Sequence, residues 1–421
     1  MVAILVTAMA FSLWWNPLTH HGASWDTPHD LWNTYRTAQY VGWGFEGEIY
    51  KSQSYFDSFP GIAVLLAPLA KVAGGLHLSA NFLFGLPRPT AWLLLGPANA
   101  ILGGVLLFPL EGLARRLSVS SGRRVVLIWL EAGFIFWTAV VWGHPEYTLA
   151  LAFAIYGLMA ALDGRWVRVG IFMGLALLFQ PLTALMLPVV ILYLPPRRWS
   201  GTAAIVALPS AVLLIPPLLK EWHATTFTLL RQPNYPTVDH PTPWLSLAPV
   251  LQRSHRAFVE VPKLVTRPDG THSLEYVRAA IRIDAVVSAG PGRLVALVLA
   301  CAIGIYVAKT KPSLAMIVWW VAVCLTLRCV FECVMNPYYL LPAGAVILVL
   351  AAALNNVRFF AISVIVAAFT VLSYQFMSPW AYYTSVVGLL VVAMALACPR
   401  DRPRTRPRPD TDSETNLQRA K

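Results

Sequence analysis

The stretch "HDLWNTYRTAQYVGWGFEGEIYK", residues 29–51, gathers acids, amides, an arginine and aromatic residues directly after an apolar N-terminus. Asp26 and Asp30 stand four positions apart, so in a helix they would share one face. A carboxylate there can act as a general base that takes a proton from a hydroxyl group, and a second carboxylate beside it can raise its pKa. The alternative is that both acids are solvated and cap a short helix that starts at "TPHD".

Arg328 lies deep in the apolar run "WWVAVCLTLRCVFECVMNPYY", residues 319–339. A charged side chain inside such a run is costly unless it faces a cavity or a partner, so it indicates a functional site. Glu332 follows at the i+4 position and can pair with it across one helical turn. The arginine can therefore bind an anionic group, or the pair can simply neutralise itself.

Other polar residues interrupt the apolar segments at single places. His144 and Glu146 fall in the turn "WGHPEY", where they can contact a bound molecule or cap a helix. Glu131 lies in the middle of an apolar run, where an acid marks a functional position by default, although a hydrogen bond inside the protein would also hold it. Gln180 precedes a proline in "FQPLT".

His240 belongs to the proline-stiffened segment "NYPTVDHPTPWLSLAP", residues 234–249, with Tyr235, Asp239 and Trp244. Aromatic faces with fixed polar groups suit the binding of a sugar ring. A rigid loop packed against the rest of the protein would show the same sequence, so both interpretations stay open.

The composition is that of a membrane-embedded chain: 57% of the residues are hydrophobic, 12% are charged and the mean hydropathy is +0.61. Apolar runs long enough to cross a bilayer as helices recur from end to end. No strand-like alternation is sustained over about ten residues, which argues against a transmembrane β-barrel. The first run, residues 2–18, has neither a basic start nor a cleavage site, so we interpret it as a retained first span.

Short basic loops set the expected topology, because Arg-rich and Lys-rich loops stay in the cytoplasm. Six such segments occur, at 114–124, 163–168, 195–199, 309–311, 355–358 and after Pro399. One assignment of membrane spans places all six segments in the cytoplasm. Its ten spans run over about 2–18, 89–114, 125–142, 147–162, 202–219, 292–308, 313–331, 337–354, 358–374 and 378–397. Residues 169–194 have basic flanks on both sides and a proline in the middle, which predicts a broken hairpin that enters the membrane and returns.

We therefore predict an all-α, multi-pass protein of the plasma membrane with a single bundle over residues 1–398. Two large loops, 19–88 and 220–291, lie outside the cell together with the "WGHPEY" turn. In the first loop, residues 52–78 are expected to form an interfacial helix. The tail 399–421 alternates Arg with Pro, and we expect a disordered cytoplasmic anchor, not a nucleic-acid-binding segment.

An ordered series of motifs runs through the first 220 residues: Asp30 with Tyr35, Gly44 and Tyr50, then "FPGIAVLLAPLA", a span ending in two arginines, and "GHPEYTLALAFAIYGLMAALDGRWVRVGIFMGLALLFQPLTALMLPVVIL". This series resembles the GT-C superfamily of polyprenyl-phosphate-sugar-dependent membrane glycosyltransferases, above all glycosyltransferase family 87, the bacterial alpha-mannosyltransferase-like group. After Lys220 the resemblance rests on the bundle layout and on "NPYYLLP".

The resemblance implies a polyprenyl-phosphate sugar donor, with mannose as the first choice and a pentose such as arabinofuranose as an alternative, and a glycan or glycolipid acceptor outside the cell. It implies that Asp30 is the general base, because Asp30 matches the family's acid by its spacing to Tyr35 and Tyr50. Tyr35 can anchor the loop or pack against the sugar. The departing phosphate needs a cation, a role that suits Arg328. Gln180 departs from the family pattern, where a lysine commonly precedes the hairpin proline.

Nucleotide-binding and metal-binding signatures are not seen: there is no Walker A loop, no G-x-G-x-x-G, no H-E-x-x-H and no cysteine cluster. A divalent cation could be recruited by Asp26, Asp30 or Glu332, but no ligand spacing requires one. Two other interpretations remain. One is a transporter or flippase of lipid-linked sugars, since broken helices and charges inside the membrane occur there too. The other is a non-catalytic relative of the GT-C enzymes.

Overall fold

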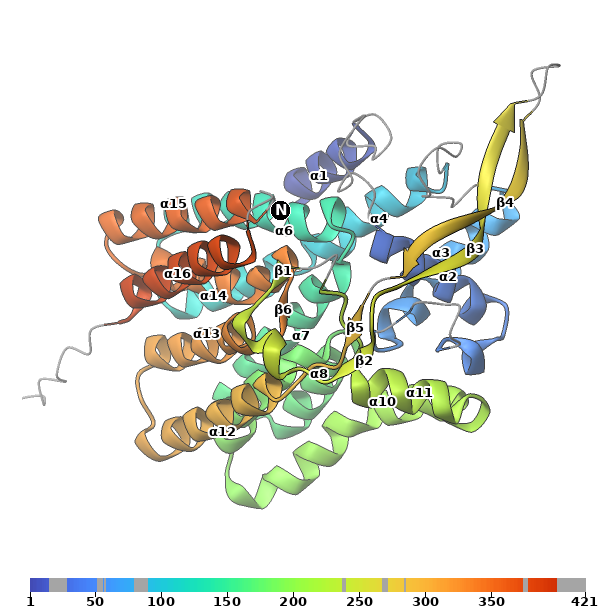
Figure 1. Cartoon of the computed structure of the whole chain (residues 1–421). Coiled ribbons are helices and arrows are strands. Elements are labelled where there is room, and N and C mark those ends of the chain that lie inside the picture. The colour runs from blue at the N-terminus through green and yellow to red at the C-terminus, as the bar shows by residue number, and fades with distance from the viewer. Residues whose placement is uncertain are drawn as a thin grey trace, which may run out of the picture.

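Helices make up most of the chain in the computed structural model and pack side by side as a bundle (Figure 1). The structure describes residues 1–14, 29–50, 56, 58–78, 90–236, 240–266, 272–283, 285–373 and 378–399. The α-helices are α1 (Val2–Trp14), α2 (His29–Gly42), α3 (Gly61–Gly75), α4 (Trp92–Gly104), α5 (Leu107–Arg116), α6 (Ser121–Phe136), α7 (Pro145–Leu162), α8 (Trp166–Phe179), α9 (Leu187–Leu192), α10 (Trp199–Lys220), α11 (Trp222–Arg231), α12 (Gly292–Thr310), α13 (Leu314–Phe331), α14 (Leu340–Ala352), α15 (Asn356–Leu372) and α16 (Pro379–Ala397).

Seven helical segments are long and apolar enough to cross a membrane, which supports a membrane-embedded protein. They are Trp92–Arg116, Ser121–Val141, Pro145–Leu162, Pro196–Lys220, Gly292–Thr310, Leu314–Phe331 and Pro379–Ala397. Three further predicted spans form shorter apolar helices, Val2–Leu13, Pro337–Ala352 and Asn356–Leu372. The membrane character is therefore supported, while the predicted number of ten spans is not established.

The predicted interruption before Pro181 is present. α8 ends at Phe179, Gln180 has an extended backbone (φ −150°, ψ 113°), and a 3-10 turn over Pro181–Met186 leads into α9. α8 and α10 run parallel, since Gly170 lies against Ile205 and Gly174 against Pro209. Two parallel neighbours must start from the same end, so the chain returns between them. This is the out-and-back path that the hairpin prediction requires.

The five basic segments within the described residues lie at one end of the bundle, which we call the basic end. Five contacts join them to one another, to Tyr193 just before segment 195–199, and to the residue that follows α16. They are Arg116 with Asp163 (2.8 Å), Arg198 over the Trp166 ring (5.0 Å), Lys311 with the Tyr193 carbonyl (2.9 Å), Arg123 with Asn356, and Arg358 with the Cys398 carbonyl (3.4 Å). The topology predicted from loop charge sets these loops on one side of the membrane, and the packing of the helices sets them at one end of the bundle. Of the predicted tail, only Pro399 falls within the described residues.

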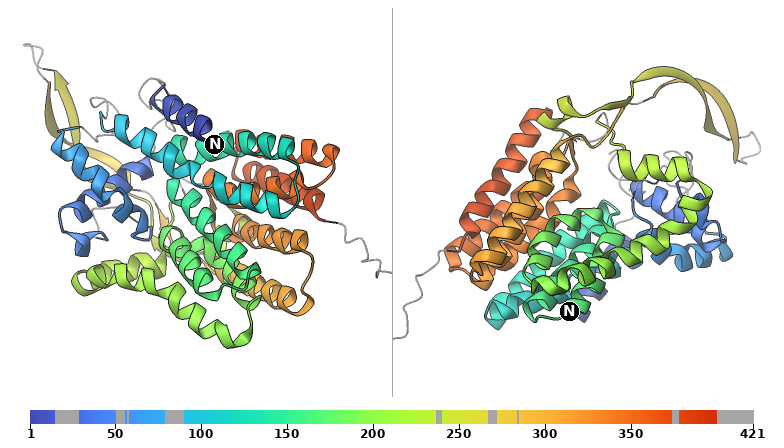
Figure 2. Two further views of the ribbon diagram at one scale, coloured as in Figure 1. Left: turned by 180° about the vertical axis from the view of Figure 1, so that it is seen from behind. Right: turned by 90° about the horizontal axis from the view of Figure 1, so that it is seen from below.

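The opposite end, which we call the polar end, carries strands that the sequence analysis did not predict. The described strands form three antiparallel pairs: β1 (His240–Pro241) with β6 (Val334–Met335), β2 (Val250–Gln252) with β5 (Val286–Val287), and β3 (His255–Thr266) with β4 (His272–Ile283). β3 and β4 form a long ribbon that extends away from the helices (Figures 1 and 2). Its register sets Glu260 opposite Arg278 and Lys263 opposite Glu275.

Two apolar cores hold the described helices together. The larger one surrounds α14, in which every residue from Leu340 to Ala352 is buried. The second joins α2, α3 and α4 to Leu149 and Ala150 of α7 and to Phe179 of α8. Within the predicted first loop, α2 and α3 are therefore anchored against the ends of the bundle helices. Whether α3, which lies within the predicted interfacial stretch 52–78, rests at a membrane surface stays a prediction.

Candidate functional site

Arg328 lies near the end of α13, in a closed polar cluster at the polar end of the bundle. Its side chain is only 8% exposed. Its Nη1 donates a hydrogen bond of 2.9 Å to the Tyr147 hydroxyl, and its Cζ lies 3.3 Å from the centre of the Tyr339 ring. A guanidinium group stacks well on aromatic faces and is less strongly hydrated than an ammonium group, which is why an arginine can be placed here.

Glu332 neutralises part of this charge. α13 ends at Phe331, and Glu332 follows with an extended backbone (φ −70°, ψ 147°). The predicted pair is confirmed, because Arg328 Nε lies 3.3 Å from Glu332 Oε2. The other carboxylate oxygen, Oε1, accepts a hydrogen bond of 2.5 Å from Nε of Arg293. Glu332 is 1% exposed and so stands as a buried carboxylate between two guanidinium groups.

The sequence analysis did not select Arg293. The residue is the second of α12, directly after "GPG" and before a long apolar run. A cation at the edge of a span is usually an anchor for the interface, so its position alone gave little reason to choose it. The predicted topology was the useful signal. The span that starts beside Arg293 begins at the same membrane face at which the span containing Arg328 ends.

The "WGHPEY" turn forms as expected between two helices. Gly143 has φ +72°, and His144 precedes Pro145 at the start of α7. His144 Nδ1 lies 2.5 Å from Glu146 Oε1, and both side chains are buried, at 9% and 5% exposure. Which of the two groups donates the proton depends on the histidine tautomer.

Aromatic rings join this turn to Arg328. The His144 ring lies 3.7 Å from the Tyr338 ring, and Tyr147 lies 5.1 Å from Tyr338 and 6.0 Å from Tyr339. Tyr338 and Tyr339 belong to the 3-10 turn Pro337–Tyr339 in "NPYYLLP". Four of the predicted site residues, His144, Glu146, Arg328 and Glu332, thus lie in one connected cluster.

His240 lies at the same end but makes a different contact. Its ring stacks on Tyr382 of α16 at 3.6 Å with an interplanar angle of 16°. Two residues on, the Thr242 hydroxyl donates a hydrogen bond of 2.5 Å to the Glu332 backbone carbonyl, and β1 pairs with β6. Burial lowers the pKa of His240. His240 therefore belongs to a short segment, residues 240–242, that packs over the end of α13. We call this segment the His240 strap.

Tyr35 and Gln180 are placed elsewhere. Tyr35 is buried on α2 in the second apolar core, and burial raises the pKa of its hydroxyl. Gln180 is buried at the break between α8 and the following turn, and its backbone carbonyl accepts a hydrogen bond of 2.9 Å from Thr183. Phe179, next to Gln180, packs in the same core as Tyr35. The first loop and the broken hairpin are thereby joined through apolar contacts.

Neither candidate for the general base has a described side chain. Asp30 falls in α2, where only its backbone is described, and Asp26 lies outside the described residues. Their roles stay predictions. Within the residues that the structure describes, no three His, Cys, Asp or Glu side chains are grouped to hold a metal ion.

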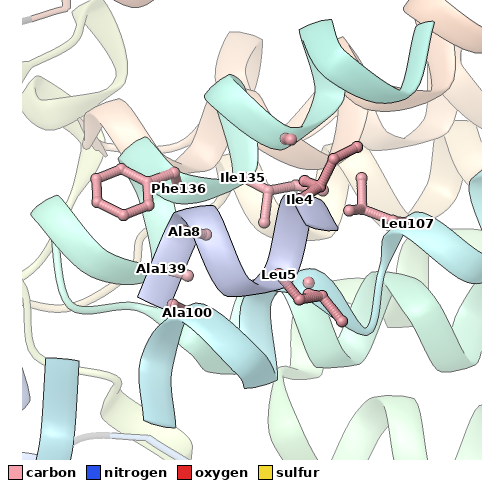
Figure 3. Close-up of a pocket in the computed structure, with 10 residues that line it drawn as sticks. Ile4, Leu5, Ala8, Ala100, Leu107, Ile135, Phe136 and Ala139 are labelled. Carbon is pink, nitrogen blue, oxygen red and sulfur yellow. The ribbon is translucent and has the colours of Figure 1, made fainter. Parts of the chain in front are cut away.

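Two cavities among the described residues are apolar, and no residue of this cluster lines either of them. Figure 3 shows one between α1, α4 and α6, lined by Leu5, Ala100 and Ile135. Another, of about 270 Å³, lies between α6, α14 and α15. The polar cluster itself is closely packed in this structure.

Comparison with known proteins adds no family to this description. No protein-family model matches the chain, and a search of curated proteins finds no similar sequence. The resemblance to the GT-C enzymes therefore stays a prediction from the sequence.

Proposed function

We propose that this chain is an integral membrane glycosyltransferase that moves a sugar from a polyprenyl-phosphate donor to a glycan or glycolipid acceptor. In this proposal the polar end of the bundle is the active side and lies outside the cell, an orientation that the basic segments at the other end favour. Mannose is the sugar that the resemblance implies. The observation that carries the proposal is the pair Arg293 and Arg328, held on one buried carboxylate beside a group of aromatic rings.

The charges of the cluster suit a phosphate leaving group. Two guanidinium groups, of Arg293 and Arg328, share the single carboxylate of Glu332, so these three residues carry one positive charge in excess. The carboxylate of Glu146 is held separately, by His144. A departing phosphate monoester carries about two negative charges at neutral pH. Guanidinium groups match phosphate oxygens in geometry, and a buried site strengthens the attraction. A phosphate can therefore replace Glu332 as the partner of one arginine.

The remaining groups have roles that fit sugar transfer. The rings of Tyr147, Tyr338 and Tyr339 give apolar faces for a sugar, and His144 with Glu146 gives hydrogen-bonding groups. In the reaction the acceptor oxygen forms a bond with the anomeric carbon while the bond from that carbon to the phosphate oxygen breaks. The acceptor proton passes to a carboxylate, for which Asp30 is our first candidate and Asp26 the second.

Membranes containing the protein, supplied with a radiolabelled polyprenyl-phosphate sugar, test the proposal. Wild-type membranes should form a labelled glycan or glycolipid, and Asp30→Asn should abolish this while the protein still inserts. Glu46→Gln is the matched control, because Glu46 is an exposed acid of the same loop, and it should retain transfer. Undiminished transfer by Asp30→Asn would reject Asp30 as the base. Failure of the wild type with every such donor would reject the function.

A transporter of lipid-linked sugars is the second candidate, and one buried group favours it. Glu131 of α6 is completely buried, and neither carboxylate oxygen has a hydrogen-bond partner among the described residues. The helix break at Gln180 is also typical of transporters. Vesicles that move the labelled lipid-linked sugar across the membrane without forming product would support this second function.

A further inference from the structure

Helix α11 has the reverse of the polarity expected for a helix at the surface of a water-soluble protein. Its buried positions are the threonines Thr225 and Thr228, and the Thr225 hydroxyl donates a hydrogen bond of 3.0 Å to the Pro217 carbonyl. Its exposed positions include Trp222 (59%) and Leu230 (79%). Apolar side chains pointing outward over such a helix indicate an apolar neighbour outside the protein.

The length of α10 fixes where α11 lies. α10 starts at the basic end and has 22 residues, which span about 33 Å at 1.5 Å per residue. That length just exceeds the roughly 30 Å of the hydrocarbon core. α10 presents Val212 (51%) and Leu219 (83%) outward along this path. α11 follows directly after α10, so a bilayer that α10 crosses would have its lipid headgroups near the exposed apolar face of α11.

Basic side chains follow directly on this face. The backbone carbonyl of Arg231, the last residue of α11, accepts hydrogen bonds from Ser288 and Ala289, which ties the helix to the base of the β3–β4 ribbon. Four arginines are among the side chains described as exposed between positions 222 and 278. They are Arg231, Arg253, Arg256 and Arg278. Arg278 lies 5.5 Å from the ring of Phe258, which is 68% exposed.

From these features we propose that α11 and the base of the β3–β4 ribbon bind the bilayer leaflet at the polar end, with a preference for anionic phospholipid headgroups. Leu230 and Phe227 enter the acyl boundary, Trp222 lies at headgroup depth, and the arginines bind lipid phosphates. This binding would keep the loop that carries the His240 strap at a fixed height above the membrane. The inference does not depend on sugar transfer.

The depth of α11 can be measured with a nitroxide at Leu230→Cys in reconstituted vesicles, after Cys301 and Cys398 are changed to serine. The label should collide readily with oxygen and rarely with a water-soluble nickel chelate, as one at Val212→Cys on α10 does. Gly122→Cys, at an exposed position in the first turn of α6 at the basic end, is the aqueous control. A Leu230 label as open to the nickel chelate as the Gly122 label would overturn the proposal.

The headgroup preference needs a local measurement, because the basic end also attracts anionic lipid. A fluorophore is attached at Val250→Cys, a position that is 60% exposed beside the ribbon. Its quenching is then compared between vesicles that contain nitroxide-bearing phosphatidylglycerol and vesicles that contain nitroxide-bearing phosphatidylcholine. We expect stronger quenching by phosphatidylglycerol. The preference should fall by up to about fivefold for each arginine removed in Arg253→Gln, Arg256→Gln and Arg278→Gln, and should weaken in high salt. Equal quenching by both lipids in the unchanged loop would refute the preference, and sugar transfer need not change in either case.

Discussion

Glu332 is the residue on which the charge balance of the polar cluster depends. Its carboxylate is 1% exposed and contacts Arg293 and Arg328. Removing one partner of a buried ion pair leaves an uncompensated charge, which costs about 3–5 kcal/mol. Glu332→Gln should therefore lower the free energy of unfolding by about that amount, measured by denaturant unfolding of the purified protein. Glu48→Gln should change it by less than about 1 kcal/mol, because the pair of Glu48 with Lys220 is partly exposed. Equal effects of the two substitutions would contradict this role.

His240 should make the strap sensitive to acid. Burial lowers its pKa from the ordinary value of 6.5, so the folded state favours the neutral ring. The unfolded chain then binds more protons as the pH falls, and stability is complete above about pH 6.5 and is lost progressively below it. The thermal midpoint of the wild type should fall between about pH 7.5 and about pH 5 more than that of His240→Phe, which keeps the stack on Tyr382 without a titrating group. Parallel pH profiles would show that His240 is not responsible.

The free-energy cost of burying a charged side chain decided which site residues could be predicted from the sequence. Arg328 stands out in any apolar run because burying it is expensive, and its partner Glu332 follows from helical spacing. Arg293 is chemically as important to the cluster, but a cation at the edge of a span looks like an ordinary anchor. Tyr147 was also missed, because aromatic residues are common near membrane surfaces and only the fold brings it to Arg328.

At the scale of elements, α1 packs against small residues of α4. Gly96, Ala100 and Gly104 repeat every four positions, and a side chain added at Gly104 would meet Leu5 of α1 (Figure 3). Small residues let membrane helices approach closely. Gly104→Ile should therefore lower the free energy of unfolding by about 1–3 kcal/mol, the usual cost of overpacking.

Gly388→Ile is the matched control for that substitution. Gly388 lies in α16, and nothing stands within 4 Å of a side chain placed there. Unfolding of the two variants in the same detergent gives the comparison. A Gly104→Ile protein as stable as the Gly388→Ile protein would mean that α1 is not held by this contact.

The elements differed in how far local sequence decides them. The break at Gln180 was predictable because Pro181 lies in the middle of an apolar run that has basic residues on both flanks, whereas α10 continues through three prolines. The β3–β4 ribbon was not predicted, although residues 255–283 contain many β-branched residues. Strand preference depends strongly on context, and a two-stranded ribbon forms only when the partner strand is in register. A helix that must present apolar side chains to lipid leaves a stronger hydropathy pattern in the sequence than a ribbon that lies outside the membrane.

At the scale of the whole molecule, charge decides which end of the bundle is which. The six basic segments were assigned to one side from the resistance of basic loops to translocation, and contacts join the five that the structure describes at one end. Packing of helices and selection of loop charge are independent physical processes. Their agreement supports the arrangement of the two ends, and the candidate site lies at the end opposite the basic segments.

Two engineered cysteines can determine which end of the bundle faces the outside of the cell. Gly122 is exposed in the first turn of α6 at the basic end, and Ser246 is exposed in the turn Pro243–Leu247 at the polar end. In intact cells a membrane-impermeant maleimide should label Ser246→Cys, whereas Gly122→Cys should react only after the cells are permeabilised, because the basic loops remain in the cytoplasm. Labelling of both from outside would mean that the two ends do not lie on opposite sides of the membrane. The reverse order would place the Arg293 and Arg328 cluster in the cytoplasm, where an outer-leaflet donor could not reach it.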